Sequence, residues 1–222
     1  VLEGGLRYER STIRQIGDNA RERSFQYPKP RFLATWTPNP RTTLRFRAER
    51  ELGQLDFGDF VSTADLTTGV VAAGNPELEP DKTWVTELTA ERRFWDTGAL
   101  VVTVRHEQIT DVIDRIPIDV LDPVTGAVVD TFEAPGNIGD GTNDELEIDL
   151  TLPLKRFGLT GAELKVDATW RDSEVTDPTT SESRRISRQR PDPIEATYRH
   201  DLPSRNLTSV VQYFARWPGA NS

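Results

Sequence analysis

The most constraining feature of the sequence is a two-residue alternation of apolar and polar side chains over unusually long segments. Between Glu145 and Leu154 every even position is apolar, and the odd positions up to Thr151 are polar. Successive side chains of a strand point to opposite faces, so such a strand has one apolar and one polar face. The pattern recurs around residues 2–9, 43–50, 100–106, 162–170 and 194–202, and no sustained helical period competes with it.

The alternation and the turn-forming residues together predict nine strands. They span approximately residues 1–13, 25–37, 42–54, 83–95, 99–117, 145–155, 161–174, 193–203 and 206–216. Short connections at 37–41, 96–98, 155–160 and 203–205 alternate with long ones at 14–24, 55–82, 118–144 and 175–192. An up-and-down membrane barrel has tight turns at one rim and long loops at the other. We therefore predict an all-β, antiparallel up-and-down transmembrane β-barrel.

Strand length and aromatic placement support a membrane location. Soluble strands average about 5–6 residues, whereas 11 residues at about 3.3 Å each and a tilt near 45° cover roughly 25 Å of a bilayer. Two levels of aromatic residues resemble the interfacial belts of membrane barrels. Trp36, Phe94 and Trp95 lie towards the short turns, and Tyr8, Tyr27, Trp84 and Trp170 lie towards the long loops.

Composition excludes several classes of function. The net charge of −9 and the lack of a basic, aromatic-rich run argue against nucleic acid as a partner. The absence of cysteine excludes disulfides and thiolate metal sites, and two histidines are too few for a histidine metal cluster. No apolar run reaches the roughly 18 residues of a spanning helix, which excludes a helical membrane protein but not a barrel.

Three motifs carry a resemblance to a known family. The first is Gly74-Asn-Pro-Glu-Leu-Glu-Pro-Asp-Lys82, which precedes a strand. The second runs from Tyr27 through Trp36-Thr-Pro38 to Leu44-Arg-Phe46, and the third joins Asn137-Ile-Gly139 to Leu146-Glu-Ile148. Together they resemble the barrel domain of TonB-dependent receptors. After Gly139 the family usually reaches a glycine, a hydrophobic residue and a glutamate within a few residues, whereas here residues 140–145 intervene and Asp144-Glu-Leu-Glu147 stands in place of the glycine.

The resemblance implies a barrel of 22 strands with a plug domain inside it. Residues 1–222 would then be part of that barrel domain, with the plug and the terminal strands outside the chain. It further implies a bacterial outer-membrane receptor that takes up a siderophore, cobalamin or an oligosaccharide with TonB-supplied energy. The implied partners are outer-membrane lipid and lipopolysaccharide, the plug, the TonB complex through the plug, and the small-molecule ligand. No cofactor is implied, and the energy-coupling residues lie outside this chain.

Ligand contacts are expected in the long outer loops, because loops held by a rigid scaffold often carry binding residues. The candidates are Arg184, Arg185, Arg188, Arg190, Asp140 and Asp144. The arginines have an alternative role as a solvated or lipopolysaccharide-facing loop. Asp140–Glu145 offers oxygen ligands for Ca²⁺, but its spacing is not that of an EF-hand and its residues are ordinary turn formers. We therefore predict no metal site.

Two further groups invite a functional interpretation. Arg92 and Arg93 with Glu87 and Glu91 could bind an anion, although a polar wall facing the barrel interior explains them as well. His200, Asp201 and Ser204 are the residue types of a hydrolase triad, but no nucleophile-elbow motif accompanies them. We predict no enzyme activity. The alternative to a transport receptor is a soluble or secreted carbohydrate-binding or adhesion module, favoured by the negative charge and a mean hydropathy of −0.55.

Overall fold

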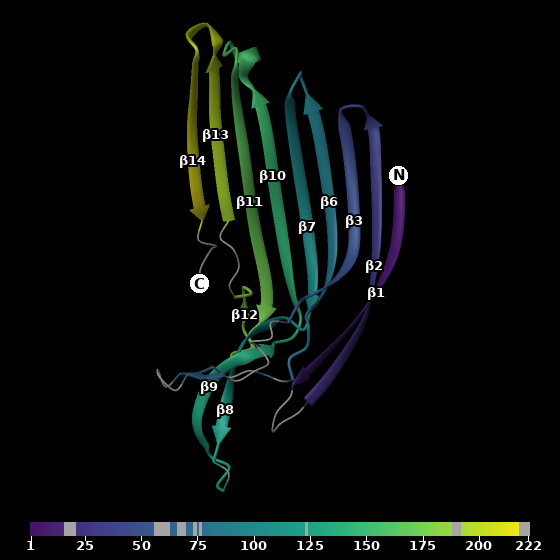
Figure 1. Ribbon diagram of the computed structural model, residues 1–222, viewed down its shortest axis with the longest axis vertical. Coiled ribbons are helices and arrows are strands. Elements are labelled where there is room, and N and C mark those ends of the chain that lie inside the picture. The colour runs from purple at the N-terminus through teal and green to yellow at the C-terminus, as the bar shows by residue number, and fades with distance from the viewer. Residues whose placement is uncertain are drawn as a thin grey trace.

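The computed structural model describes residues 1–15, 21–55, 63–65, 70–72, 75, 77–122, 124–187 and 192–217. Nine long strands form one antiparallel sheet in which each pairs with its neighbours in chain order (Figure 1). Across the sheet these are β1 (Leu2–Gln15), β2 (Arg21–Asn39), β3 (Thr42–Leu52), β6 (Lys82–Phe94), β7 (Gly98–Thr110), β10 (Gly141–Pro153), β11 (Ala162–Thr176), β13 (Asp192–Leu202) and β14 (Leu207–Trp217). The predicted fold class is confirmed, as an incomplete and therefore open barrel wall.

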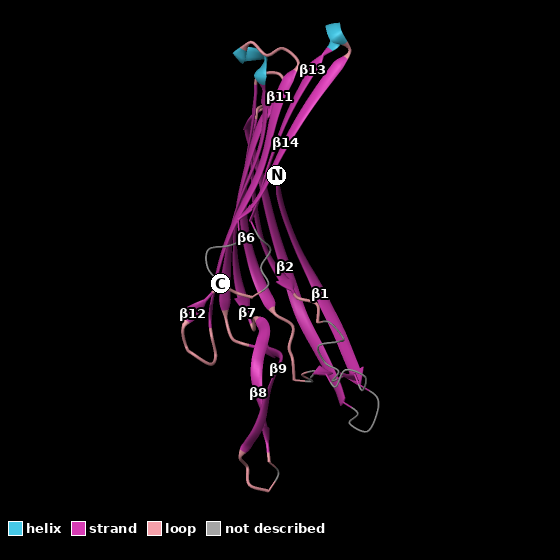
Figure 2. Cartoon of the chain, turned by 90° about the vertical axis from the view of Figure 1, so that its left-hand side faces the viewer, coloured by secondary structure: helices cyan, strands magenta, loops and turns pink. Residues whose placement is uncertain are grey.

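The connections alternate in length as predicted. Tight turns at 40–41 and 95–97, the 3₁₀ turn η1 (Leu154–Phe157) and the 3₁₀ turn η2 (Pro203–Arg205) lie at one end of the sheet (Figure 2). Gly158 and Asn206 end the two 3₁₀ turns in the left-handed conformation, which returns the chain sharply towards the next strand. The short strands β4 (Thr63–Asp65), β5 (Val70–Ala72) and β12 (Ser183–Arg184) belong to the long connections.

The prediction of one strand over 99–117 followed by a loop over 118–144 is wrong. Strand β7 ends at Thr110, because Asp111 adopts a left-handed backbone with φ of 62° and turns the chain out of the sheet. A separate hairpin follows, made of β8 (Ile113–Leu121) and β9 (Val128–Asn137), which form a two-stranded sheet of their own. The hairpin extends beyond the main sheet on the side of the long connections (Figure 1).

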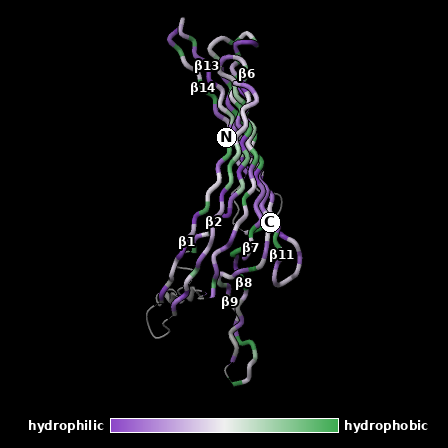
Figure 3. Tube along the Cα trace, turned by 90° about the vertical axis from the view of Figure 1, so that its right-hand side faces the viewer, coloured by the Kyte–Doolittle hydropathy of each residue, from purple (hydrophilic) through white to green (hydrophobic). Residues whose placement is uncertain are grey.

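The alternation gives the main sheet two unlike faces, and hydrophobic and hydrophilic residues alternate along its strands (Figure 3). On the apolar face, Leu88, Val104 and Val211 remain 50–60% exposed. Elsewhere in the described residues the only other sheets are the pairs β4–β5 and β8–β9. Within the described part of the chain, no second sheet therefore packs on this apolar face, as one would in a soluble sandwich.

The opposite face carries charged side chains that neutralise one another across the strands. Arg47 lies opposite Glu87, Glu87 opposite Arg105, Arg105 opposite Glu145, and Glu145 opposite Arg171. The charge thus alternates in a single row across five strands. Ion pairs of 2.8 Å between Arg47 and Glu87 and of 2.5 Å between Arg171 and Glu145 hold its two ends. Opposite charges at directly facing positions stabilise the register of a sheet.

Most of the aromatic residues predicted to form the two belts lie on the apolar face. Trp36 and Tyr8 are 65% and 62% exposed, and Trp84 and Trp170 are also exposed large hydrophobic residues. Tyr27 is an exception, since it pairs with Glu9 in register and its ring lies 5.7 Å from the Lys82 ammonium. It belongs to the charged face and not to an outer aromatic belt.

Candidate ligand-facing loop cluster

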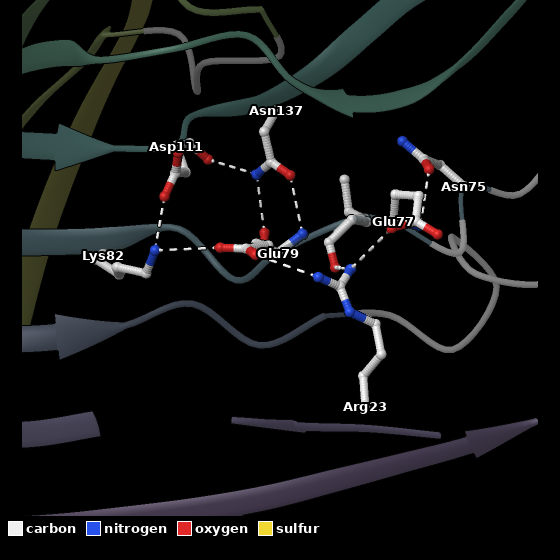
Figure 4. A network of polar contacts seen from close by, with 8 residues as sticks. Arg23, Asn75, Glu77, Glu79, Lys82, Asp111 and Asn137 are labelled. Carbon is white, nitrogen blue, oxygen red and sulfur yellow. Dashed lines mark hydrogen bonds and ion pairs between the residues drawn. The ribbon is translucent and has the colours of Figure 1, made fainter. Parts of the chain in front are cut away.

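The segment that leads into β6 is joined to the β8–β9 hairpin through the side chain of Asn137 (Figure 4). The Asn137 amide oxygen accepts the Glu79 backbone N–H at 2.8 Å, and its amide nitrogen donates to the Glu79 carbonyl at 2.9 Å. The same nitrogen donates to the Asp111 carbonyl at 2.8 Å. One side chain therefore satisfies three backbone groups from two connections that are far apart in the sequence.

Charged residues reinforce this junction on both sides. Lys82, the first residue of β6, donates to Asp111 at 2.6 Å and to Glu79 at 3.4 Å (Figure 4). Arg23, near the start of β2, donates to Glu79 at 3.2 Å and to the Leu78 carbonyl at 3.4 Å. Leu78 is completely buried beneath this network. The 77–82 segment thus connects β2, β6 and the hairpin.

A small apolar cluster supports the base of the hairpin. Val112, Ile138 and Val175 are buried and come from β11 and from the two ends of the hairpin. Ile109, Ile116 and Ile186 pack against them. Burial of apolar surface stabilises such a contact by about 25 cal/mol per Å², so the loops on this side have a core of their own.

Arg184 joins the connection after β11 to the same hairpin. Its guanidinium donates to Asp114 of β8 at 2.9 Å and to Asp177 at 2.8 Å. Asp114 is almost enclosed, with 7% of its side chain exposed, and it also accepts the Ser187 backbone N–H at 3.4 Å. The predicted ligand residue Arg184 is therefore engaged by two carboxylates of the protein itself.

The neighbouring predicted residues occupy different surroundings. Arg185 donates to the Arg171 carbonyl and lies 3.6 Å from Asp172. Asp140 is exposed, just before β10. Asp144 lies within β10 and not in a loop, and it contacts Nδ1 of His106 at 2.7 Å. Arg188 and Arg190 lie outside the described residues.

The carboxylates around Arg184 are held in their charged form. The pKa of Asp177 is lowered to about 2, first by the Thr180 backbone N–H and then by the Arg184 guanidinium. Burial of Asp114 would by itself raise its pKa. Hydrogen bonds from Ser187, Arg115 and Arg184 outweigh that effect and lower the pKa. These contacts favour ionised carboxylates at neutral pH.

Sequence reasoning did not reveal the residues that hold this cluster together. Asn137 belongs to a quoted motif, but its role depends on Glu79, which is 58 residues away. No motif in the sequence around Asp114 indicated its role. The 140–145 stretch, weighed above as an oxygen-rich loop, lies in β10 from Gly141 onwards. In the described residues no group of three or more histidine and carboxylate side chains is arranged to hold a metal ion.

Comparison with known proteins decides the family. The model of the family described as "TonB dependent receptor-like, beta-barrel" matches residues 1–221. The chain belongs to the TonB-dependent receptor family. This family implies a plug domain, the TonB complex and small-molecule ligands, and its members are outer-membrane receptors and transporters and not enzymes. A search of curated proteins returns no match.

Solved structures of TonB-dependent receptors share the fold at low sequence identity. The FrpB iron transporter from Neisseria meningitidis aligns over 95% of this chain, with a TM-score of 0.62 and 16% identity. The hemophore receptor HasR from Serratia marcescens aligns over 98%, with a TM-score of 0.66 and 12% identity. The siderophore receptor PirA from Pseudomonas aeruginosa aligns over 96%, with a TM-score of 0.61 and 13% identity. The chain spans 30%, 41% and 41% of these three chains.

The surroundings of His200 do not have the geometry of a hydrolase triad. Its Nδ1 contacts the Tyr198 hydroxyl and its Nε2 contacts the Thr160 carbonyl, each at 3.2 Å. Asp201 points to the opposite face of β13 and accepts hydrogen bonds from Arg199 and Thr208. The histidine and the carboxylate therefore do not form the base and orienting pair that a triad requires.

Proposed function

We propose that this chain is part of the barrel wall of a bacterial outer-membrane receptor that takes up a scarce ligand with TonB-supplied energy. The observation that carries the proposal is the uncovered apolar face of nine long, paired strands in a chain that matches the family over residues 1–221. In lipid, each unpaired backbone group costs several kcal/mol, and strand pairing removes that cost. The apolar face meets lipid, and the charged face lines the lumen around the plug.

The long connections form the ligand-facing end of this wall. The contacts of Asn137, Arg184 and Lys82 hold three of them in a fixed arrangement. Pre-ordered loops bind with a smaller loss of conformational entropy than mobile ones. Arg184, Arg185, Arg188, Arg190 and Asp140 stay our proposed ligand contacts, whereas Asp144 lies within β10 and not in a long connection.

An iron-containing small molecule is the ligand class that we favour. The similar structures are described as an iron transporter, a receptor bound to a hemophore with heme, and a siderophore receptor. Cobalamin and an oligosaccharide are the other ligand classes of the proposal. The remaining partners are the plug, the TonB complex through the plug, outer-membrane lipid and lipopolysaccharide.

The alternative of a soluble carbohydrate-binding or adhesion module has the acidic charge and low hydropathy in its favour. It conflicts with the exposure of the apolar face. Tyr213 and Val211 of β14 are 62% and 60% exposed, although both lie in the middle of a strand. Monomeric soluble proteins rarely expose large continuous apolar patches. A bilayer accounts for this face without an additional layer of protein.

Cell fractionation of a strain that expresses the full-length parent protein tests the location. An outer-membrane protein whose gel migration changes on heating supports the proposal, and a soluble periplasmic or secreted protein would refute it.

Ligand uptake is tested by exchanging the hairpin tip, residues 118–132, which leaves Asn137 and Asp114 in place. We expect altered uptake after this exchange and unaltered uptake after exchange of the short turn 203–206. Unchanged binding and uptake in the tip chimera would refute the assignment of the loops.

A further inference from the structure

Two neighbouring arginines of β6 lie on opposite faces of the sheet, and among the described residues only Arg93 has a carboxylate partner. Arg93 shares the charged face with Glu91, and its Nε lies 2.7 Å from the Glu91 carboxylate. Arg92 shares the apolar face with Leu88 and donates to the Thr42 hydroxyl. The two residues therefore do not form one anion-binding row. Arg92 instead places a guanidinium on the side of the sheet that meets lipid.

Arg92 lies at the level of the aromatic belt next to the short turns. Trp36 is opposite Leu44, and Leu44 is opposite Ala90, two residues before Arg92. Phe94 follows two residues after Arg92 and ends the strand. Arg92 is thus between the levels of Trp36 and Phe94 in the sheet, where a membrane barrel passes from the apolar core to the headgroups. Long cationic side chains at this depth extend their charge towards the headgroups.

A second cation belongs to the same belt. The Arg156 guanidinium carbon of η1 lies 5.1 Å from the centre of the Trp95 ring, which in turn packs against Phe94 and Phe157. Phe157 is 64% exposed. An arginine over an aromatic face is attracted by the ring and keeps its charge. Exposed apolar rings beside such a charge form an amphipathic surface suited to a membrane interface.

The distribution of charge indicates what this surface binds. In the part of the chain that the structure describes, neither Arg92 nor Arg156 forms an ion pair with a carboxylate, whereas Arg47, Arg93 and Arg171 of the charged face all do. The tight connections carry four cationic residues and one carboxylate, although the chain as a whole has a net charge of −9. The cationic residues are Arg41, Lys155, Arg156 and Arg205, and the carboxylate belongs to Asp96. A belt with positive charge is complementary to anionic lipid.

We propose that Arg92 and Arg156 bind the headgroup phosphates of anionic phospholipid in the leaflet next to the short turns. This inference rests on the proposed function, because it requires the apolar face to meet a membrane. The guanidinium groups bind the phosphate oxygens, and the rings of Trp36, Trp95 and Phe157 lie at the interface around them. Phosphatidylglycerol is preferred over phosphatidylcholine, because its headgroup has a net negative charge, whereas the choline ammonium neutralises the phosphate of phosphatidylcholine.

Native mass spectrometry of the full-length receptor tests the proposal. The receptor is released from detergent in the presence of phosphatidylglycerol or phosphatidylcholine, and the retained lipid is measured. We expect wild type to retain phosphatidylglycerol preferentially. Each of Arg92→Gln and Arg156→Gln should weaken this retention about fivefold, and the double variant about 25-fold. Arg93→Gln, the matched control on the other face, should retain the lipid as wild type does.

Two further comparisons keep the result interpretable. The variant with Arg92→Lys and Arg156→Lys keeps both charges and should keep most of the lipid, which separates binding from a folding defect. Heat-dependent gel migration reports whether each barrel is folded. Equal retention by wild type and the double Gln variant, or an equal loss in Arg93→Gln, would overturn the lipid site. Absence of the receptor from the outer-membrane fraction would instead refute the proposed function.

Discussion

The side-chain amide of Asn137 pairs with the backbone of Glu79 as a neighbouring strand would, with one hydrogen bond accepted and one donated at 2.8 and 2.9 Å. This two-bond contact connects the motif before β6 to the end of the hairpin. It fixes the 77–82 segment at the point where β6 begins to pair with β3 and β7. The junction joins two long connections that are far apart in the sequence.

Replacement of Asn137 by alanine should release this junction. The substitution removes three hydrogen bonds and leaves two Glu79 groups and the Asp111 carbonyl to find other partners. A hydrogen bond contributes about 0.5–1.5 kcal/mol, so we expect local destabilisation of roughly 2–4 kcal/mol. Hydrogen exchange in the full-length receptor should accelerate at residues 77–82 and 128–137. Asn39→Ala is the control, because Asn39 ends β2 and accepts the Arg41 backbone N–H of a short turn, and it should affect only that turn. Unchanged exchange at 77–82 in Asn137→Ala would contradict the prediction.

The alternating charge row should contribute to strand register through coupled pairs. A double-mutant cycle on Arg47→Gln and Glu87→Gln should give a coupling energy of about 0.5–1 kcal/mol, since the two side chains are 21% and 23% exposed and lie 2.8 Å apart. The exposed pair Arg14 and Glu22, 3.9 Å apart, is the matched control and should give almost no coupling. Denaturant unfolding of the receptor in detergent measures both cycles. An equal coupling energy in the two cycles would contradict the predicted contribution of the charge row to strand register.

The two faces of β6 should respond differently to a new charge. Leu88→Arg places a cation on the apolar face, and in a membrane barrel this costs about 2–4 kcal/mol near the bilayer centre. Thr89→Arg places the same cation on the charged face and should cost much less. Unfolding from lipid vesicles gives the two free energies. Equal, small costs for both variants would be the result for a water-exposed sheet and would refute the lipid-facing assignment.

The contact between Arg184 and Asp177 should weaken in acid. The folded-state pKa of Asp177, about 2, lies below its ordinary value of 3.8, so its stabilising effect is complete above about pH 4 and is lost as the pH falls through 2. Asp114 acts in the same direction, because its pKa is also lowered. A spin label at Ser181→Cys should therefore become more mobile between pH 4 and pH 2. In Asp177→Asn the label should be more mobile already at pH 7, and identical profiles for both proteins would contradict the prediction.

Much of the fold could be predicted because alternation is a local property of the chain. Leu146 and Glu147 are adjacent residues of opposite character, and a strand turns them to opposite faces wherever it lies. The order of long and short connections then leaves an up-and-down sheet as the simplest arrangement. The predicted strand limits were less accurate where a long connection contains short strands of its own. The left-handed Asp111 that separates β7 from β8 leaves no trace in the apolar pattern.

The sequence alone therefore determined the nine long strands apart from the end of β7, their two faces, the two rims and the family resemblance, since each depends on residues close together in the chain. Only the tertiary structure decided that Asn137 binds Glu79, that Arg184 joins Asp114 to Asp177, and that Arg92 and Arg93 face opposite environments with different partners. The physical reason is distance. Hydrogen bonds and ion pairs depend on positions to within a few tenths of an ångström, and strand register sets those positions across segments that are far apart in the sequence.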